Sequence, residues 1–114
     1  AVFLKGKDRT YIGNAGFVTV SQKHQSAEIG YFIDEVYSGQ GYATEACEKL
    51  LHVGFHNFQF NRIYARCMAR NIASQRVLKK IGMRHEGRFL QEYKKNNHFE
   101  DIDYFAILKQ EYTL

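Results

Sequence analysis

The segment at residues 38–44 is the feature that most constrains this chain, because it joins a strand-like stretch to a strongly helical one. It consists of Ser38-Gly39-Gln40-Gly41-Tyr42-Ala43-Thr44. The first amides of a helix have no partner within the helix, and the helix dipole places positive charge at the same end. Glycine also lacks the Cβ that would keep a phosphate group away from these amides. The segment therefore predicts a backbone site for an anion such as a pyrophosphate.

Two familiar phosphate loops were compared with these residues. The P-loop of nucleotide hydrolases has two glycines five residues apart, followed by Lys and Ser or Thr, whereas Gly39 and Gly41 are two apart and Tyr42 follows. The dinucleotide fingerprint has Gly or Ala where Thr44 stands and an acidic residue after the next strand, which here ends in Arg66 to Arg70. The P-loop is excluded, and the dinucleotide fingerprint is a poor match.

Hydrophobic periodicity predicts an α/β (α+β) domain with a mixed, mostly antiparallel sheet and flanking helices. Strands are expected over residues 1–4, 10–20, 27–33 and 61–70, and a closing hairpin over 88–93 and 99–108 around a turn at 95–98. Apolar residues at helical spacing from Ala43 to Phe58 predict one helix, and a second helix begins after Asn71 and ends near Gly82. Gly13 and Gly16 predict a bulge or a close backbone contact in their strand.

Length and composition limit the class of protein. The 114 residues fit a single domain, 1–114, and contain neither a stretch of the ~18–20 apolar residues that span a membrane nor a signal-peptide pattern. Cys47 and Cys67 lack metal-ligand spacing and are interpreted as two buried thiols in a reducing cytoplasm. The net charge of +4 comes from dispersed basic residues without a nucleic-acid motif, so we expect no nucleic-acid partner.

Several motifs in order resemble those of GNAT acetyltransferases, and most of all the branch that acetylates the N-termini of ribosomal proteins. These motifs are residues 32–34, 42–46, 71–74, 80–83, 86–88, 92–93 and 101–104. The resemblance covers essentially the whole chain and implies a GNAT fold with an acetyl-CoA site whose pyrophosphate rests on residues 39–44. It departs from the family at Ser38, where Gln or Arg is usual, so only the backbone of Ser38 is expected to contribute.

The resemblance also implies that the family's first strand and first two helices are lacking here. In GNAT domains those elements form one wall of the acceptor cleft. We therefore expect an N-terminally incomplete domain whose exposed apolar surface is covered either by about fifty further residues upstream or by self-association into a homo-oligomer.

The roles of individual residues follow from the same resemblance. Asn71 is expected to face the pantetheine arm, beside its capping of the helix. Ser74 would protonate the departing CoA thiolate, since the tyrosine that does so in many GNATs is replaced here by Leu78. Glu92 is the candidate general base, with Glu28 as its main competitor, and a backbone N–H near Ile33 would meet the oxyanion.

The predicted activity is direct transfer of an acetyl group from acetyl-CoA to a primary amine, without a metal or a covalent intermediate. A protein N-terminus is the first candidate acceptor, and polyamines, amino sugars and antibiotics are the alternatives. A second alternative is an acyl-CoA-binding module without turnover.

Overall fold

The computed structural model describes residues 2–3 and 11–112. Strands lie at β1 (Val2–Phe3), β2 (Tyr11–Ser21), β3 (Ser26–Ile33), β4 (Arg62–Met68), β5 (Arg84–Lys95) and β6 (His98–Leu108). Two α-helices, α1 (Tyr42–His52) and α2 (Ile72–Lys80), alternate with them. The 3-10 helices η1 (Glu35–Tyr37) and η3 (Lys109–Glu111) and the π-helical turn η2 (Val53–Asn57) complete the order. The predicted order of strands and helices is confirmed, although residues 1 and 4 of the first expected strand and residue 10 of the second lie outside the described residues.

One sheet of six strands, in the order β1-β2-β3-β4-β6-β5, carries both helices. Within the described residues its neighbouring strands run antiparallel except β3 and β4, which are parallel. The predicted mixed, mostly antiparallel sheet is therefore confirmed. The β5–β6 hairpin turns at Asn96 and Asn97, whose φ values of 50° and 64° suit the left-handed turns that Asn tolerates.

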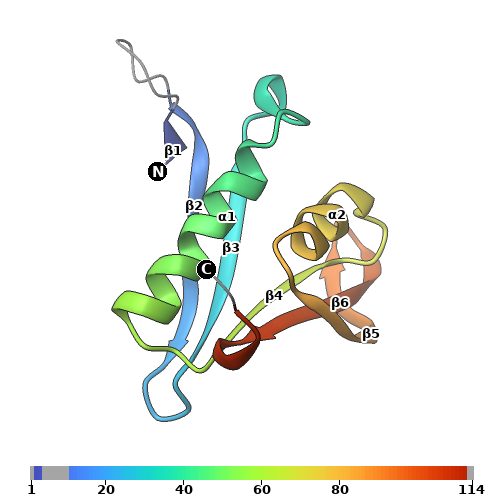
Figure 1. Ribbon diagram of the computed structural model, residues 1–114. Helices are drawn as coiled ribbons and strands as arrows, with labels where there is room; N and C mark the ends of the chain where they lie inside the picture. Colours follow the sequence, from blue (N-terminus) through green and yellow to red (C-terminus); the bar gives the residue numbers. More distant parts are fainter. Residues whose placement is uncertain (1, 4–10, 113–114) are drawn as a thin grey trace.

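The sheet opens between β3 and β4. Their pairing is limited to Ser26–Glu28 against Arg62–Tyr64, after which the strands diverge. Figure 1 shows the two halves of the sheet meeting near the start of β3 and separating towards its end, where the 38–44 segment lies. We call this space the β3–β4 opening.

A single core packs both helices against the sheet. Its members include Ile29 of β3, Leu51 of α1, Ile63 of β4, Leu78 of α2 and Phe105 of β6, all of which are buried. This packing explains the apolar periodicity of both helices and fixes their ends relative to the β3–β4 opening.

Two details of the fold differ from the expectation. The predicted helix over residues 43–58 is α-helical only to His52 and continues as a π-helical turn to Asn57, and Phe58 is exposed. The bulge in β2 lies between Phe17 and Thr19 rather than at a glycine. The predicted close contact is nevertheless present at Gly13, because a Cβ there would lie 2.0 Å from the carbonyl oxygen of Phe32.

Candidate functional site

The 38–44 segment presents bare backbone at the start of α1. Gly39 and Gly41 have φ values of 77° and 83°, in the left-handed region that favours glycine, and a Cβ at either position would meet no atom within 4 Å. Gly41 is the N-cap of α1 and provides no side-chain cap, so the first amides of an 11-residue helix are not covered by their own cap. This geometry is suited to an anion.

The polar and aromatic side chains of the 38–44 segment lie in different surroundings. The Ser38 hydroxyl donates a hydrogen bond of 2.8 Å to the carbonyl oxygen of Glu35, so it turns back into η1. Thr44, in the first turn of α1, is buried, while Gln40 is exposed and the Tyr42 ring contacts that of Tyr37. The backbone is therefore the part of the segment that is available to a ligand.

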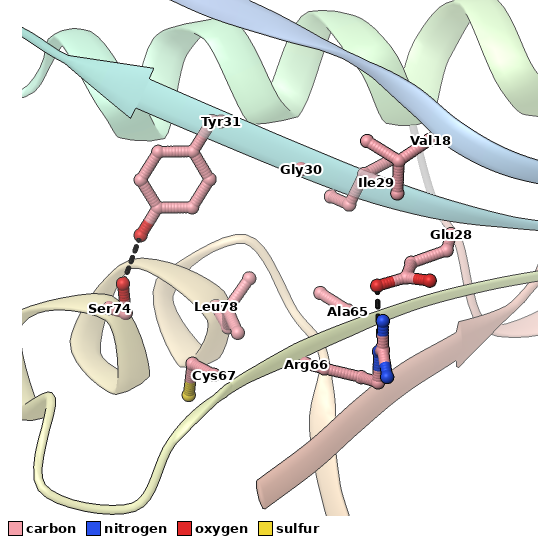
Figure 2. A pocket seen from close by; sticks show the side chains of 10 residues that line it. All are labelled: Val18, Glu28, Ile29, Gly30, Tyr31, Ala65, Arg66, Cys67, Ser74 and Leu78. Carbon is pink, nitrogen blue, oxygen red and sulfur yellow. Dashed lines mark hydrogen bonds and ion pairs between the residues drawn. The ribbon is translucent and has the colours of Figure 1, made fainter. Parts of the chain in front are cut away.

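A cavity of about 260 Å³ lies in the β3–β4 opening (Figure 2). Its lining comes from β2, β3, β4 and α2, and consists of Val18, Glu28, Ile29, Gly30, Tyr31, Ala65, Arg66, Cys67, Ser74 and Leu78. Ile29, Ala65 and Leu78 of the core form part of the wall, and two polar pairs, Tyr31 with Ser74 and Glu28 with Arg66, cross the cavity. Where the backbone pairing of β3 and β4 has ended, the side chains that line the cavity connect the two halves of the sheet, which we call its arms.

The backbone of β3 offers a donor to this opening. The amide of Asp34 donates to the carbonyl oxygen of Ile12 across β2 and β3, at 2.6 Å. Because bonded positions alternate along an antiparallel strand, the amide of Ile33 faces away from β2 and towards the side that β4 has left. This is the position at which the sequence predicted a backbone N–H for an oxyanion.

Ser74 lies in the first turn of α2 and faces the cavity. The Asn71 side chain caps this helix by accepting a hydrogen bond of 3.1 Å from the Ser74 amide, which confirms the predicted N-cap. The Ser74 hydroxyl accepts a hydrogen bond of 2.9 Å from the phenol of Tyr31, on the opposite arm. Burial raises the pKa of Tyr31, so the phenol remains protonated and remains a donor at neutral pH.

Glu28 lies on β3 near the closed end of the opening and is only 7% exposed. Its Oε2 accepts a hydrogen bond of 2.9 Å from Nε of Arg66 on β4. This hydrogen bond raises the pKa of Arg66, which therefore stays cationic. One oxygen of Glu28 is thus already committed to a guanidinium.

Glu92 belongs to the same network, although it comes from β5. Its Oε1 lies 3.9 Å from Arg66 NH1, and both of its oxygens lie 3.0 Å from the Tyr104 hydroxyl, which donates to them. Burial raises the pKa of Tyr104, and the hydrogen bond to Glu92 adds to this effect. Arg66 therefore connects the two carboxylates that the sequence had offered as competing bases.

A bulge in β5 accounts for the position of Glu92. The ladder between β5 and β6 shifts register between Phe89 and Tyr93, Gln91 has a φ of 53°, and its amide donates to Oδ1 of Asp101 at 2.8 Å. Bulges redirect side chains and occur often beside active sites. The sequence identified Glu92 but gave no sign of the bulge.

Three residues of the site were not selected from the sequence, namely Tyr31, Arg66 and Tyr104. The alternation of residues 27–33 puts Tyr31 on the same face of the strand as Ile29, and this was the available signal for a side chain in the opening. The roles of Arg66 and Tyr104 depend on strand pairing, since they lie opposite one another on β4 and β6.

Asp103 forms a separate polar cluster beneath the sheet. Its carboxylate is 1% exposed and accepts hydrogen bonds from Arg88 and from Gln75, with His85 Nε2 at 3.0 Å. The hydrogen bond from Arg88 holds the pKa of Asp103 below its usual value. These contacts fix β5 and α2 to β6.

Among the described residues, no set of three or more His, Cys, Asp or Glu side chains is arranged to hold a metal ion. Nor does any described helix have the length and apolar character needed to cross a membrane. Cys47 and Cys67 are both free thiols; Cys47 is buried as predicted, whereas Cys67 is only partly buried, because it lines the cavity. Burial raises the pKa of Cys47 to about 12 and that of Cys67 to about 11.

Comparison with known proteins gives the class to which this fold and site belong. The acetyltransferase (GNAT) domain family matches residues 1–84. Over 98% of its length, the chain is 40% identical to the uncharacterised N-acetyltransferase YnaD of Bacillus subtilis (strain 168), of which it covers 65%. An acetyltransferase (GNAT family) from Bacillus anthracis, 36% identical, superposes with a TM-score of 0.83 over 90% of this chain and 61% of that chain. The chain belongs to the GNAT acetyltransferase family.

Relatives of the ribosomal-protein branch are among the similar proteins. The chain is 29% identical to the ribosomal-protein-serine acetyltransferase of Escherichia coli (strain K12), over 92% of this chain and 59% of that protein. It spans less than two thirds of the length of either curated relative.

Proposed function

We propose that this chain forms the acetyl-CoA site of an N-acetyltransferase and transfers the acetyl group directly to a primary amine. The observation that carries the proposal is the bare start of α1, which follows β3 in the chain, together with the cavity between β3, β4 and α2 that Ser74 lines. A polyanionic ligand with a long, partly apolar arm fits these two features.

The backbone supplies the anchor for the pyrophosphate. The amides that follow Gly39 and Gly41 would bind it, because helix starts favour anions and the glycines leave open space in front of them. The pantetheine arm of the cofactor would then enter the β3–β4 opening, where Ile29 and Leu78 offer apolar walls. Asn71 is the N-cap of α2, one turn before Ser74, and its side chain can border the pantetheine arm there.

The reaction requires few side-chain contributions. Holding the reactants in good geometry lowers the activation barrier by up to about 7–11 kcal/mol through proximity. The Ile33 amide would donate to the developing oxyanion, and Ser74 would donate to the departing sulfur. An α-amino group has a pKa of about 7.7–8.0, so a single carboxylate acting through water is sufficient as the base.

We assign the base to Glu92 in preference to Glu28. Glu28 has one oxygen held by Arg66 at 2.9 Å, whereas Glu92 is 3.9 Å from the same guanidinium and more open to water. Arg66 and Tyr104 would hold the Glu92 carboxylate in place through the reaction.

The acceptor that we propose is the α-amino group of a protein N-terminus, as in the ribosomal-protein branch. The support is the 29% identity with the ribosomal-protein-serine acetyltransferase over 92% of this chain. Small amines such as polyamines, amino sugars and aminoglycosides are the competing acceptors.

The test combines ligand binding with product formation. Acetyl-CoA should raise the melting temperature of the chain, and CoA release should follow when N-terminal peptides are offered beside polyamines and aminoglycosides. Gly41→Asp should abolish acetyl-CoA binding, because it puts a side chain and negative charge where the pyrophosphate would lie. Gly87→Asp is the matched control, since Gly87 of β5 also has open space but lies outside the segment.

The outcomes separate the candidate functions. Unchanged CoA affinity in a folded Gly41→Asp variant would refute the cofactor site. Binding of acetyl-CoA without acetylation of any amine would instead favour an acyl-CoA-binding module. Acetylated product from small amines alone would show that a small amine, and not a protein N-terminus, is the acceptor.

A further inference from the structure

The hydrogen bond between Tyr31 and Ser74 crosses the β3–β4 opening. Tyr31 extends from β3 and Ser74 from α2, so the two side chains come from opposite arms of the sheet, as Figure 2 shows. Both residues line the cavity, and their 2.9 Å contact is partly buried. No backbone pairing joins β3 and β4 at this level, since the described ladder ends at Glu28 and Tyr64.

We propose that Tyr31 is a positioning residue for Ser74. In this proposal, the Tyr31 phenol holds and polarises the Ser74 hydroxyl so that the hydrogen of Ser74 points at the leaving sulfur. The inference rests on the proposed acetyl transfer and adds to it a residue that acts through Ser74.

The geometry of this contact carries the inference, because it holds Oγ of Ser74 towards the opposite arm. A serine hydroxyl has one hydrogen to donate and two lone pairs that accept. With Tyr31 donating to Oγ at 2.9 Å, the hydrogen of Ser74 is left for another acceptor. A serine within a helix would otherwise donate back to the carbonyl three or four residues earlier, which here belongs to Asn71 or Arg70. The phenol opposes that alternative by holding Oγ towards the opposite arm.

Polarisation adds to orientation. A hydroxyl that accepts a hydrogen bond becomes a better donor, because linked hydrogen bonds strengthen one another at low dielectric. Tyr31 keeps this role over the pH range in which an α-amine is reactive, since burial raises the pKa of its phenol.

The proton balance does not require Tyr31 to lose its proton. As the N–C bond forms and the C–S bond breaks, the electron pair of the C–S bond stays on sulfur and the ammonium proton passes to the carboxylate base. Ser74 stabilises the new thiolate by a hydrogen bond. The CoA thiolate, whose conjugate thiol has a pKa of about 8.5, then takes a proton from water without further help.

The experiment measures the single-turnover rate of acetyl transfer, in which only the chemical step is observed. Tyr31→Phe keeps the ring and removes the hydroxyl, and we expect a loss of about fivefold in this rate with unchanged acetyl-CoA affinity. Ser74→Ala should lose a similar factor, and the double variant should lose no more than Ser74→Ala alone. Tyr112→Phe is the matched control with an unchanged rate, because its half-buried ring packs on Phe55 outside the cavity.

Three results would overturn this inference alone. An unchanged rate in Tyr31→Phe would show that the phenol has no part in the reaction. Independent losses that multiply in the double variant would show that Tyr31 does not act through Ser74. A loss confined to acetyl-CoA affinity would make Tyr31 a binding residue. Absence of product from the unsubstituted chain, with all acceptors, would refute the proposed function and this inference with it.

Discussion

Replacing Gly13 by alanine tests whether β2 and β3 must lie as close as the structure has them. Gly13 is buried and pairs with Ile33, the residue whose amide faces the β3–β4 opening. A Cβ on Gly13 would lie 2.0 Å from the carbonyl oxygen of Phe32 and 2.9 Å from Cα of Ile33. Both obstacles are backbone atoms, so no side-chain rotation can remove the overlap.

The cost follows from that geometry. Ordinary contacts of a Cβ begin at 3.4 Å, so the two strands would have to separate by more than an ångström at this pair. Overpacking of this kind costs about 1–3 kcal/mol, and alanine returns about 0.4–1 kcal/mol by restricting the unfolded chain. A net loss of about 1–2 kcal/mol lowers the melting temperature of a chain of this length by ~4–8 °C.

The assay is thermal unfolding followed by circular dichroism, with Gly16→Ala as the control. Gly16 lies on the same strand, and its Cβ would meet no atom within 4 Å, so this variant should be as stable as the parent or slightly more so. Gly13→Ala should also slow acetyl transfer, because the Ile33 amide shifts with the strand. Equal melting temperatures for the two variants would refute the reasoning.

Asp103→Asn should lower the urea midpoint at pH 7. The pKa of Asp103 is held low by Arg88, so its ionised form stabilises the fold above a pH of about 3.9, and the difference should narrow as pH falls through the lowered pKa. An undiminished difference at pH 3 would contradict this. Burial raises the pKa of Cys67 to about 11, so the native thiols at pH 8 should react with a disulfide reagent about a hundredfold more slowly than in urea, with further slowing by CoA. Similar rates in both states would contradict the burial. Glu92→Gln should flatten the acid limb of the pH–rate profile while Glu28→Gln leaves it, and the reverse result would move the base to Glu28.

Local sequence patterns were sufficient to predict most of the fold. Alternation placed the strands, and three- and four-residue spacing placed both helices, because each element buries one face in the shared core. Residues that commonly begin helices, end helices or form turns also do so here. Asn71 caps α2, Gly82 follows its end with a φ of 98°, and two asparagines turn the last hairpin.

Tertiary contacts explain what the sequence did not predict. The π-helical turn after His52 includes Gly54, where a Cβ would lie 2.6 Å from Cδ1 of Ile63, so this turn packs tightly against β4. The bulge at Gln91 depends on the Asp101 carboxylate, ten residues further along the chain. No local pattern encodes either partner.

The candidate site also has a part that local sequence predicts and a part that depends on tertiary contacts. A glycine segment before a helix is a local signal, and it predicted the open backbone of the 38–44 segment. The pairing of Tyr31 with Ser74 and the position of Arg66 between two carboxylates require β3, β4, α2 and β5 to be assembled first. Periodicity could orient each of these side chains but could not say which would meet.

The short parallel junction between β3 and β4 has a consequence for how the molecule opens. Among the described residues, the ladder between β3 and β4 has three residue pairs, and the amides of Asn61 and Arg62 donate to the carbonyl oxygen of Gln25 beside it. Side-chain packing provides the further attachment between the half that contains β1, β2 and β3 and the half that contains β4, β6 and β5. Partial unfolding in proteins proceeds by contiguous cooperative units, and this junction is a natural boundary between two of them. A ligand that contacts both arms would then act as a non-covalent cross-link. At a hundred times its Kd it would add about 2.7 kcal/mol to the stability of the joined state.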